Sequence, residues 1–218
     1  MRKLHVIMQG GIGNQLFTYM AVAEYSIKNK CKLVLHTHDL ANGFTKRKFA
    51  LNELNLPIPY EVRNNKILSL QFMRAVLAVF FRFNIPLINK FIYQPEDFGY
   101  DETLIGRKRI KVVRGYFQSY VYIDNLEKLI NGFDVSLKKP SAKYLEILEE
   151  MRRVKPMLLH VRRGDYLTLS HIYGVLTEEY YLRALSNNDS STGKEIWLAS
   201  DDPDRVICSF LHLKFNRI

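Results

Sequence analysis

The chain has 218 residues, 47% hydrophobic and 25% charged, a composition that excludes intrinsic disorder and indicates one or two globular domains. Its formal net charge of +10 predicts an acidic partner, and because no known nucleic-acid-binding module accompanies the charge, we expect an anionic membrane surface and no nucleic acid. Cys31 and Cys208 lie too far apart in sequence to suggest a disulfide framework, and the apolar run after Lys3 is too short for a signal peptide.

The N-terminal segment predicts a strand at Leu4–Met8, a glycine-rich turn at Gln9–Gln15 and an amphipathic helix to about Lys28. Glycines let backbone amides approach a phosphate, and the N-terminus of a helix adds partial positive charge. The turn lacks the third glycine of a dinucleotide fingerprint and the Gly-Lys-Ser/Thr of a P-loop. Alone, it is weak support for an anion site.

The middle of the chain predicts further strands at Leu33–His36 and Lys111–Arg114. His36 and His38 could face one way on a strand as metal ligands, but no third ligand suggests itself, so we predict no metal site. Residues 67–83 are strongly apolar, and two arginines interrupt them, so the run is too short to span a bilayer. This segment is either a core helix, which we favour slightly, or a helix lying at a membrane interface.

A helix predicted at Ser141–Arg153 leads into the most informative stretch of the chain, Met157–Tyr166. An apolar strand there opens into a glycine-containing loop that carries two adjacent arginines, Arg162 and Arg163. Ligands of α/β proteins bind at such strand ends, and a guanidinium offers a planar fork of donors that suits phosphate oxygens. The alternative is that both arginines form surface ion pairs with Asp165 or nearby glutamates.

A second strand with a polar end follows about forty residues later. Thr177 is predicted to cap a helix through Leu185, and the apolar run from Ile196 then ends in a cluster of serine and aspartates before Pro203. One such residue is enough to cap the following helix, predicted at Arg205–Leu213. The cluster Ser200-Asp201-Asp202 therefore leaves acceptors that could read a guanine base or a ribose.

Four segments occur in an order that resembles the bacterial α1,2-fucosyltransferases of glycosyltransferase family 11. They are GGIGNQLFTYMAVAEY, GYFQSYVYI, HVRRGDY and SDDPD, and the resemblance extends over nearly the whole chain from Lys3. It implies an α/β fold of the GT-B type, with two Rossmann-like domains facing each other across a cleft. It also implies inverting transfer of L-fucose from GDP-fucose to a galactose hydroxyl of a surface glycan, with no cofactor and no obligatory metal.

The resemblance also implies roles for individual residues. Arg162 and Arg163 match the pair at the donor pyrophosphate, where one of them neutralises charge as GDP leaves. His160 matches a histidine that contacts guanine, and Asp165 closes the same motif. The remaining matches are the nucleotide-reading Ser200 and Asp201 or Asp202, with the choice of aspartate left open, and the pyrophosphate-facing Gly11, Gly13 and Asn14. No general base is identifiable.

We expect an acceptor-side domain at residues 1–136 and a partial donor-binding domain at residues 137–218. Members of the family generally continue with a further block beyond the position of Ile218. We therefore expect the second domain to be incomplete, with strand edges and apolar side chains such as Trp197, Phe210 and Phe215 partly uncovered.

The expected location is the cytoplasm, with peripheral contact at the inner face of the cytoplasmic membrane as an option. Two other functions stay open from the sequence. One is a catalytically inactive, truncated remnant that at most binds GDP. The other is a nucleotide-dependent oxidoreductase, which would use the first glycine loop but would leave both later motifs unexplained.

Overall fold

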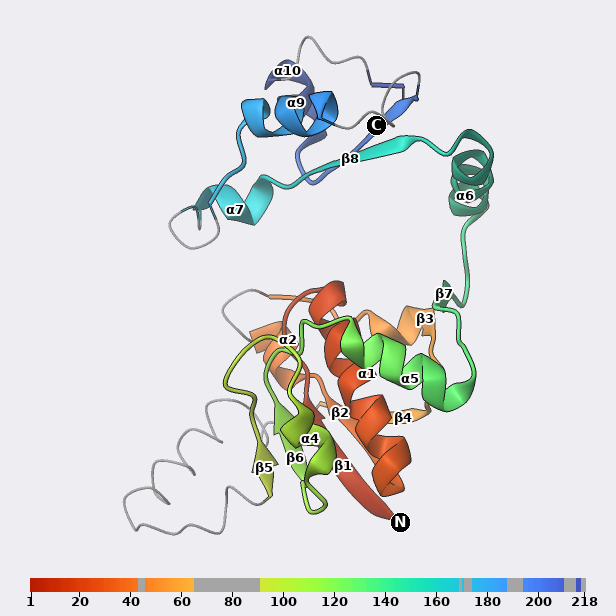
Figure 1. The fold of residues 1–218 in the computed structure, drawn as a ribbon, viewed down its shortest axis with the longest axis vertical. Coiled ribbons are helices and arrows are strands. Elements are labelled where there is room, and N and C mark those ends of the chain that lie inside the picture. Colours follow the sequence, from red (N-terminus) through yellow and green to blue (C-terminus); the bar gives the residue numbers. More distant parts are fainter. Residues whose placement is uncertain are drawn as a thin grey trace. The chain divides into compact units, whose positions relative to one another are not determined.

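The computed structural model describes residues 1–42, 46–64, 91–168, 170, 174–187, 194–209 and 215–216. The chain divides into two compact units, Met1–Lys139 (unit 1) and Pro140–Ile218 (unit 2). Each unit contains a parallel sheet with helices (Figure 1). The predicted α/β fold class is confirmed, with one parallel sheet in each of the two units. The GT-B type stays a prediction.

Two predictions concern the membrane. The apolar segment at residues 67–83 lies outside the described residues. Among the helices that are described, none combines the length and the hydropathy that crossing a bilayer requires.

Unit 1 is built on a five-stranded sheet in the order β4-β2-β1-β6-β5, in which every described pairing is parallel. The predicted strands are confirmed as β1 (Arg2–Ile7), β2 (Cys31–His36) and β6 (Val112–Arg114). Two more strands, β4 (Tyr60–Arg63) and β5 (Ile92–Tyr93), were not predicted. Both lie at sheet edges, where β5 is too short and β4 too exposed to give an apolar pattern.

Two helices pack side by side over one face of this sheet, α1 (Ile12–Asn29) and α5 (Val121–Ile130) (Figure 1). The inward residues of β1 and β2, among them Leu4, Val6 and Leu33, form one buried cluster with both helices. Unit 1 is completed by α2 (His38–Asn42), a 3-10 turn (Leu51–Glu53), α4 (Glu102–Gly106) and an antiparallel pair, β3 (Leu54–Asn55) with β7 (Ser136–Leu137).

Helix α1 begins at Ile12, three or four residues before the predicted start at Gln15 or Leu16, so part of the predicted turn is wrong. The chain reverses earlier because Gly10 has a φ of +73°, a left-handed conformation that favours glycine. Gly11 then takes the N-cap position, and the helix can start at once. As a consequence, Gly13 and Asn14 lie in the first helical turn rather than in a loop.

Unit 2 opens with α6 (Ala142–Val154), whose N-cap Ser141 accepts a hydrogen bond from the Tyr144 amide at 3.1 Å. The predicted helix at Ser141–Arg153 is thus confirmed to within one residue. The remaining elements are β8 (Met157–Val161), α7 (Gly164–Thr168), α9 (Glu178–Ser186), β9 (Ile196–Ser200) and α10 (Pro203–Ser209). Thr177 occupies the N-cap position of α9 but makes no side-chain capping bond, and the acidic first turn of α9 balances the helix dipole instead.

Strands β8 and β9 pair in parallel, and the buried core of unit 2 lies on one face of the pair. Tyr181 of α9 and Val206 of α10 cover Leu159, Val161 and Leu198. The two strands end at paired residues, so the loops that follow β8 and β9 begin next to each other at the same edge of the sheet.

The expectation of uncovered apolar side chains is wrong for Trp197, which is 3% exposed and donates from its indole nitrogen to Glu195 at 3.1 Å. Phe215 is half-buried against the core of unit 2, and Phe210 lies outside the described residues. At the start of β9, the Ile196 amide donates to the Asn216 side chain at 3.0 Å, so this part of the strand edge is paired. Leu158, in contrast, is 54% exposed on β8.

Candidate functional site

The ends of β8 and β9 bring two of the predicted motifs together within unit 2. Val161 and Ser200, the last residues of the two strands, are partners in the parallel register. The arginine loop begins directly after Val161, and the aspartate cluster directly after Ser200. Residues that are thirty-eight positions apart in sequence, Arg163 and Asp201, therefore make direct contact.

Asp201 holds the arginine loop in place. Its Oδ1 accepts hydrogen bonds from the backbone amides of Arg163 at 2.8 Å and Gly164 at 3.2 Å. These bonds to the charged form, first of all the one from Arg163, lower the pKa of Asp201 below its usual range. A Cβ added at Gly164 would lie 2.7 Å from Asp201 Oδ2, so a larger residue there would displace the Asp201 side chain.

The two arginines differ in their surroundings. Arg162 lies over the ring of Tyr166, 5.1 Å from its centroid, and its Nε is 3.9 Å from Asp201 Oδ2. Both charged side chains of that ion pair are 40% exposed, so solvent screens their attraction. Arg163 is half-buried, and its Nε is a buried donor without a hydrogen-bond partner in the described part of the chain.

An unsatisfied buried donor is costly unless a ligand or water accepts its hydrogen bond. The Arg163 guanidinium therefore offers a ready site for an anionic acceptor such as a phosphate oxygen. Arg162, the preceding residue, brings a second guanidinium to this strand end, in contact with the Tyr166 ring and the Asp201 carboxylate. Among the predicted residues, this pair is therefore the strongest candidate for an anion site.

Ser200 and Asp202 order the start of α10. The Ser200 hydroxyl oxygen accepts from the Asp202 amide at 3.0 Å, and the Asp202 carbonyl accepts from the Val206 amide at 3.2 Å. The Asp202 carboxylate lies 3.7 Å from Arg205 Nε. Both residues thus have local structural contacts, whereas Asp201 is the aspartate that connects the two motifs.

His160 and Asp165 lie on either side of the arginines in sequence. His160 is exposed on β8, paired in register with Ala199 and on the opposite face from Val161. It therefore lies away from the buried core of unit 2. Asp165 lies in α7, and its side chain is outside the described part of the structure.

The glycine loop of unit 1 depends most on a residue that the prediction did not select, Gly10. Besides its positive φ, a Cβ added to Gly10 would lie 2.5 Å from the Asn14 side-chain nitrogen. The spaces above Gly11 and Gly13 are open, with no heavy atom within 4 Å of an added Cβ, so neither glycine is required by neighbouring residues. The first turn of α1 carries no acidic residue, and no side chain caps its amides.

Asn14 and Gln15 hold the surroundings of this loop. Asn14 Oδ1 accepts from Gln118 Nε2 at 2.7 Å, which ties the first motif to the segment after β6. Gln15 is fully buried, donates to the carbonyls of Gly10 at 3.1 Å and Lys48 at 2.9 Å, and accepts from the Ala50 amide at 3.0 Å. Asn14 was predicted to face the pyrophosphate, and that role stays a prediction. In the structure it lies in the first turn of α1, where its side-chain oxygen accepts the hydrogen bond from Gln118.

His36 forms a pair that the sequence did not suggest. Its Nε2 lies 2.9 Å from Nδ1 of His5 on the neighbouring strand, while His38 begins α2 and does not share a strand face with it. Burial, followed by the charges of His5 and Arg63, lowers the pKa of His36 to about 4. In the portion of the chain that the structure describes, no group of three or more His, Cys, Asp or Glu side chains could hold a metal ion.

In sequence, the chain is similar to two glycosyltransferases. It is 26% identical over 230 residues to WbnK, an O-antigen biosynthesis glycosyltransferase of Escherichia coli, covering 91% of this chain and 72% of that protein. It is 27% identical over 189 residues to an α-1,2-colitosyltransferase of Escherichia coli, covering 82% of this chain and 61% of that protein. No protein-family model matches the chain.

Among solved structures, the fucosyltransferase NodZ from Bradyrhizobium is similar at a TM-score of 0.49 and 12% sequence identity. The match covers 100% of this chain and 78% of NodZ.

Proposed function

We propose that the chain is a glycosyltransferase that transfers L-fucose with inversion from GDP-fucose to a galactose hydroxyl of a surface glycan, such as an O-antigen, in α-1,2 linkage. The main support is the anion site of unit 2, where Asp201 holds the loop of Arg162 and Arg163 at the ends of two parallel strands. The names of both Escherichia coli relatives support transfer of a sugar, and one supports work on O-antigen.

The proposed reaction suits two fixed guanidinium groups. The acceptor oxygen forms a bond to the anomeric carbon and gives up its proton to solvent, as the bond from that carbon to the diphosphate oxygen breaks and the electron pair leaves with GDP. Negative charge therefore grows on the diphosphate in the transition state. Arginines already positioned there stabilise that charge more than the ground state, which lowers the barrier. No metal is needed for this role in the proposal.

The donor sugar, the linkage and the location are part of the proposal. One relative carries colitose in its name, so a colitose donor is the first alternative to GDP-fucose. The α-1,2 linkage is supported by the name of the same relative. We propose a cytoplasmic location, with peripheral attraction of the basic chain, of formal net charge +10, to the anionic inner face of the membrane.

One alternative keeps the nucleotide site without turnover. The chain spans 72% and 61% of the two relatives, so the activity of those whole proteins carries over as a proposal only. In that alternative, the chain binds GDP but transfers no sugar. An oxidoreductase has less support, because Leu16 occupies the place of the third fingerprint glycine and packs against the core of unit 1.

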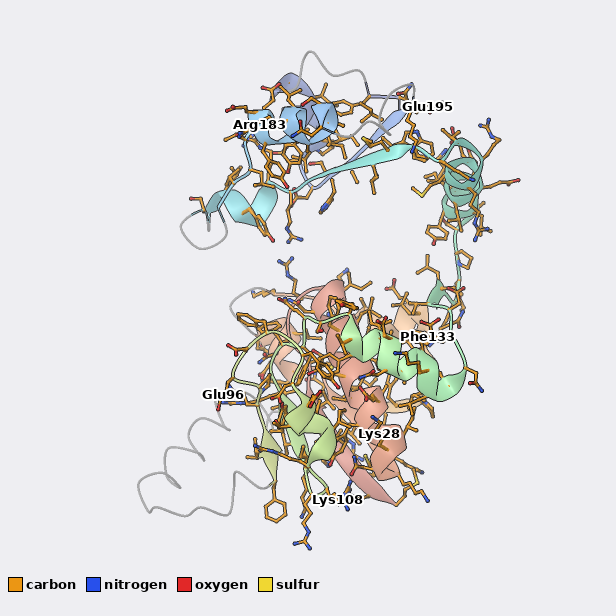
Figure 2. The ribbon with its side chains drawn as sticks, viewed as in Figure 1. Lys28, Glu96, Lys108, Phe133, Arg183 and Glu195 are labelled. Carbon is orange, nitrogen blue, oxygen red and sulfur yellow. The ribbon has the colours of Figure 1, made fainter. Side chains whose placement is uncertain are left out.

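The deciding experiment measures GDP binding by calorimetry and then sugar transfer to lactose from GDP-fucose or activated colitose. Replacing Arg162 or Arg163 by alanine should weaken GDP binding about tenfold or more, and lysine should restore it only partly because it lacks the planar fork. Arg183 on α9 (Figure 2) is a matched control, since it is mostly exposed and pairs with Glu179 at 3.9 Å.

Each outcome separates the alternatives. GDP binding with product supports the transferase, and GDP binding without product from either donor supports the inactive protein. Unchanged GDP affinity in both alanine variants would contradict the assignment of the arginines. Binding of NAD in preference to GDP would favour the oxidoreductase.

A further inference from the structure

A polar cavity of about 350 Å³ lies at the carboxyl end of β5 in unit 1, and none of the predicted site residues lines it. Its lining comes from one stretch of chain between Tyr93 and Arg107, which runs from the end of β5 through α4. The volume falls within the range of about 300–1,000 Å³ that is usual for small-molecule sites. Ligands of parallel sheets bind outside the carboxyl ends of strands, which is the position of this cavity.

The inner wall of the cavity is held by hydrogen bonds. The Tyr93 hydroxyl donates to the carboxylate of Asp101, which also accepts from the Thr103 amide at 2.8 Å and so caps α4. The Asp101 amide in turn donates to the hydroxyl of Tyr122 at 2.8 Å. Burial raises the pKa of Asp101, but the hydrogen bonds from Tyr93 and Thr103 outweigh burial and lower this pKa below its usual range. The wall is therefore already formed before any ligand binds.

The mouth of the cavity offers groups that suit a neutral sugar. Glu96 and Asp97 are exposed on the loop that leaves β5, where Figure 2 labels Glu96. Their carboxylates accept hydrogen bonds from hydroxyl groups, and the half-buried ring of Tyr100 adds an apolar surface to the lining. Arg107 is the basic residue of the lining and lies over the Tyr93 ring, 5.4 Å from its centroid. Three carboxylates against one guanidinium disfavour a phosphate or another anion here.

Hydrogen bonds connect this cavity to the glycine loop. The Gln118 amide donates to the carbonyl of Phe98 in the cavity loop at 2.6 Å. The side chain of the same glutamine donates at 2.7 Å to Asn14, in the first turn of α1 directly after the glycine loop. Arg114, at the end of β6, donates to the Gln94 side chain at 2.6 Å. The cavity and the proposed donor-facing loop are thus neighbours along one edge of the sheet.

A larger and more apolar cavity of about 570 Å³ lies at the opposite ends of the strands, lined by Met1, Leu33 and Tyr60 among others. It is at the amino ends of β1 and β2, where parallel sheets do not usually bind ligands. Nothing in its lining identifies an occupant. The polar cavity at β5 therefore carries the stronger argument.

We propose that the cavity at the end of β5 binds a neutral hexopyranose unit of the acceptor glycan, with Glu96 and Asp97 accepting hydrogen bonds from its hydroxyls. This inference rests on the proposed function, because only a sugar transferase has an acceptor glycan to bind. The nucleotide site is predicted at the arginines of unit 2, so the two sites can be titrated independently.

The test titrates the full chain with the methyl glycosides of β-galactose, β-glucose and β-N-acetylglucosamine, followed by saturation-transfer NMR, in the presence of GDP. We expect at least one glycoside to bind. The double variant Glu96→Gln, Asp97→Asn should weaken that binding about tenfold, because neutral amides replace both charged acceptors. Glu102→Gln is a matched control on α4, exposed and outside the cavity lining, and should bind sugar as the wild type does.

GDP affinity, measured in parallel, separates the two proposals. It should be the same in the wild type, the double variant and the control. No binding of any of the three glycosides, or equal sugar binding by the double variant, would overturn the cavity assignment even if GDP binds. Failure of GDP to bind the wild type would refute the transferase proposal, while the sugar titration still decides whether the cavity holds a hexopyranose.

Discussion

Replacing Asp201 by alanine tests whether the aspartate cluster organises the arginine loop. The change removes the acceptor of two backbone hydrogen bonds, from Arg163 at 2.8 Å and from Gly164 at 3.2 Å. Hydrogen bonds to a charged group contribute about 1.5–3 kcal/mol each. Since the Asp201 side chain is 40% exposed, water replaces part of this loss. We therefore expect the free energy of unfolding of unit 2 to fall by about 2–3 kcal/mol rather than by the full sum.

The chain provides its own probe for this measurement, since its single tryptophan, Trp197, lies buried on β9 of unit 2. Urea unfolding followed by tryptophan fluorescence therefore reports on the unit that contains Asp201. GDP affinity should fall about tenfold in the same variant, because the arginines lose their fixed position. Asp204→Asn is the control, an exposed carboxylate in the first turn of α10 whose loss should cost less than about 1 kcal/mol.

Acid should remove the effect of Asp201. Its folded-state pKa is lowered, so its stabilisation is fully present above the unfolded value of about 3.9 and disappears as pH falls through the folded value. The stability difference between wild type and Asp201→Ala should be constant above about pH 5 and shrink below about pH 4. Equal urea midpoints for the wild type and the variant at neutral pH would refute the view that Asp201 holds the loop.

Two further predictions concern unit 1. In urea unfolding, Gly10→Ala should lower the free energy of unfolding by about 1–2 kcal/mol or more, because it places a Cβ at a φ of +73° and 2.5 Å from the Asn14 side chain. Gly13→Ala is the control and should cost less than about 1 kcal/mol, because the space around Gly13 is open. His36 is held neutral with a pKa of about 4, so stability should fall as pH decreases from about 6.5 to 4, by at most about 3 kcal/mol. His36→Phe should flatten that part of the pH profile of thermal unfolding, and an unchanged slope would contradict it.

Much of the fold followed from local pattern. The apolar runs of β1, β2 and β8, the amphipathic repeat of α1 and the serine before α6 are signals contained in a few neighbouring residues. Short or exposed elements gave no such signal. Helix α5 was missed although its N-terminal part belongs to a motif of the resemblance, and β5 has only two residues.

For the candidate site, the sequence by itself determined the chemistry: two arginines and a cluster of acceptors, each directly after an apolar strand. It could not determine which aspartate joins the two motifs. That depended on the pairing of β8 with β9, which brings Asp201 to the amides of Arg163 and Gly164. Likewise, the contacts of Asn14 with Gln118 and of His36 with His5 join residues far apart in the chain. Such contacts depend on strand order and register, which long-range packing sets, and only the tertiary structure decided them.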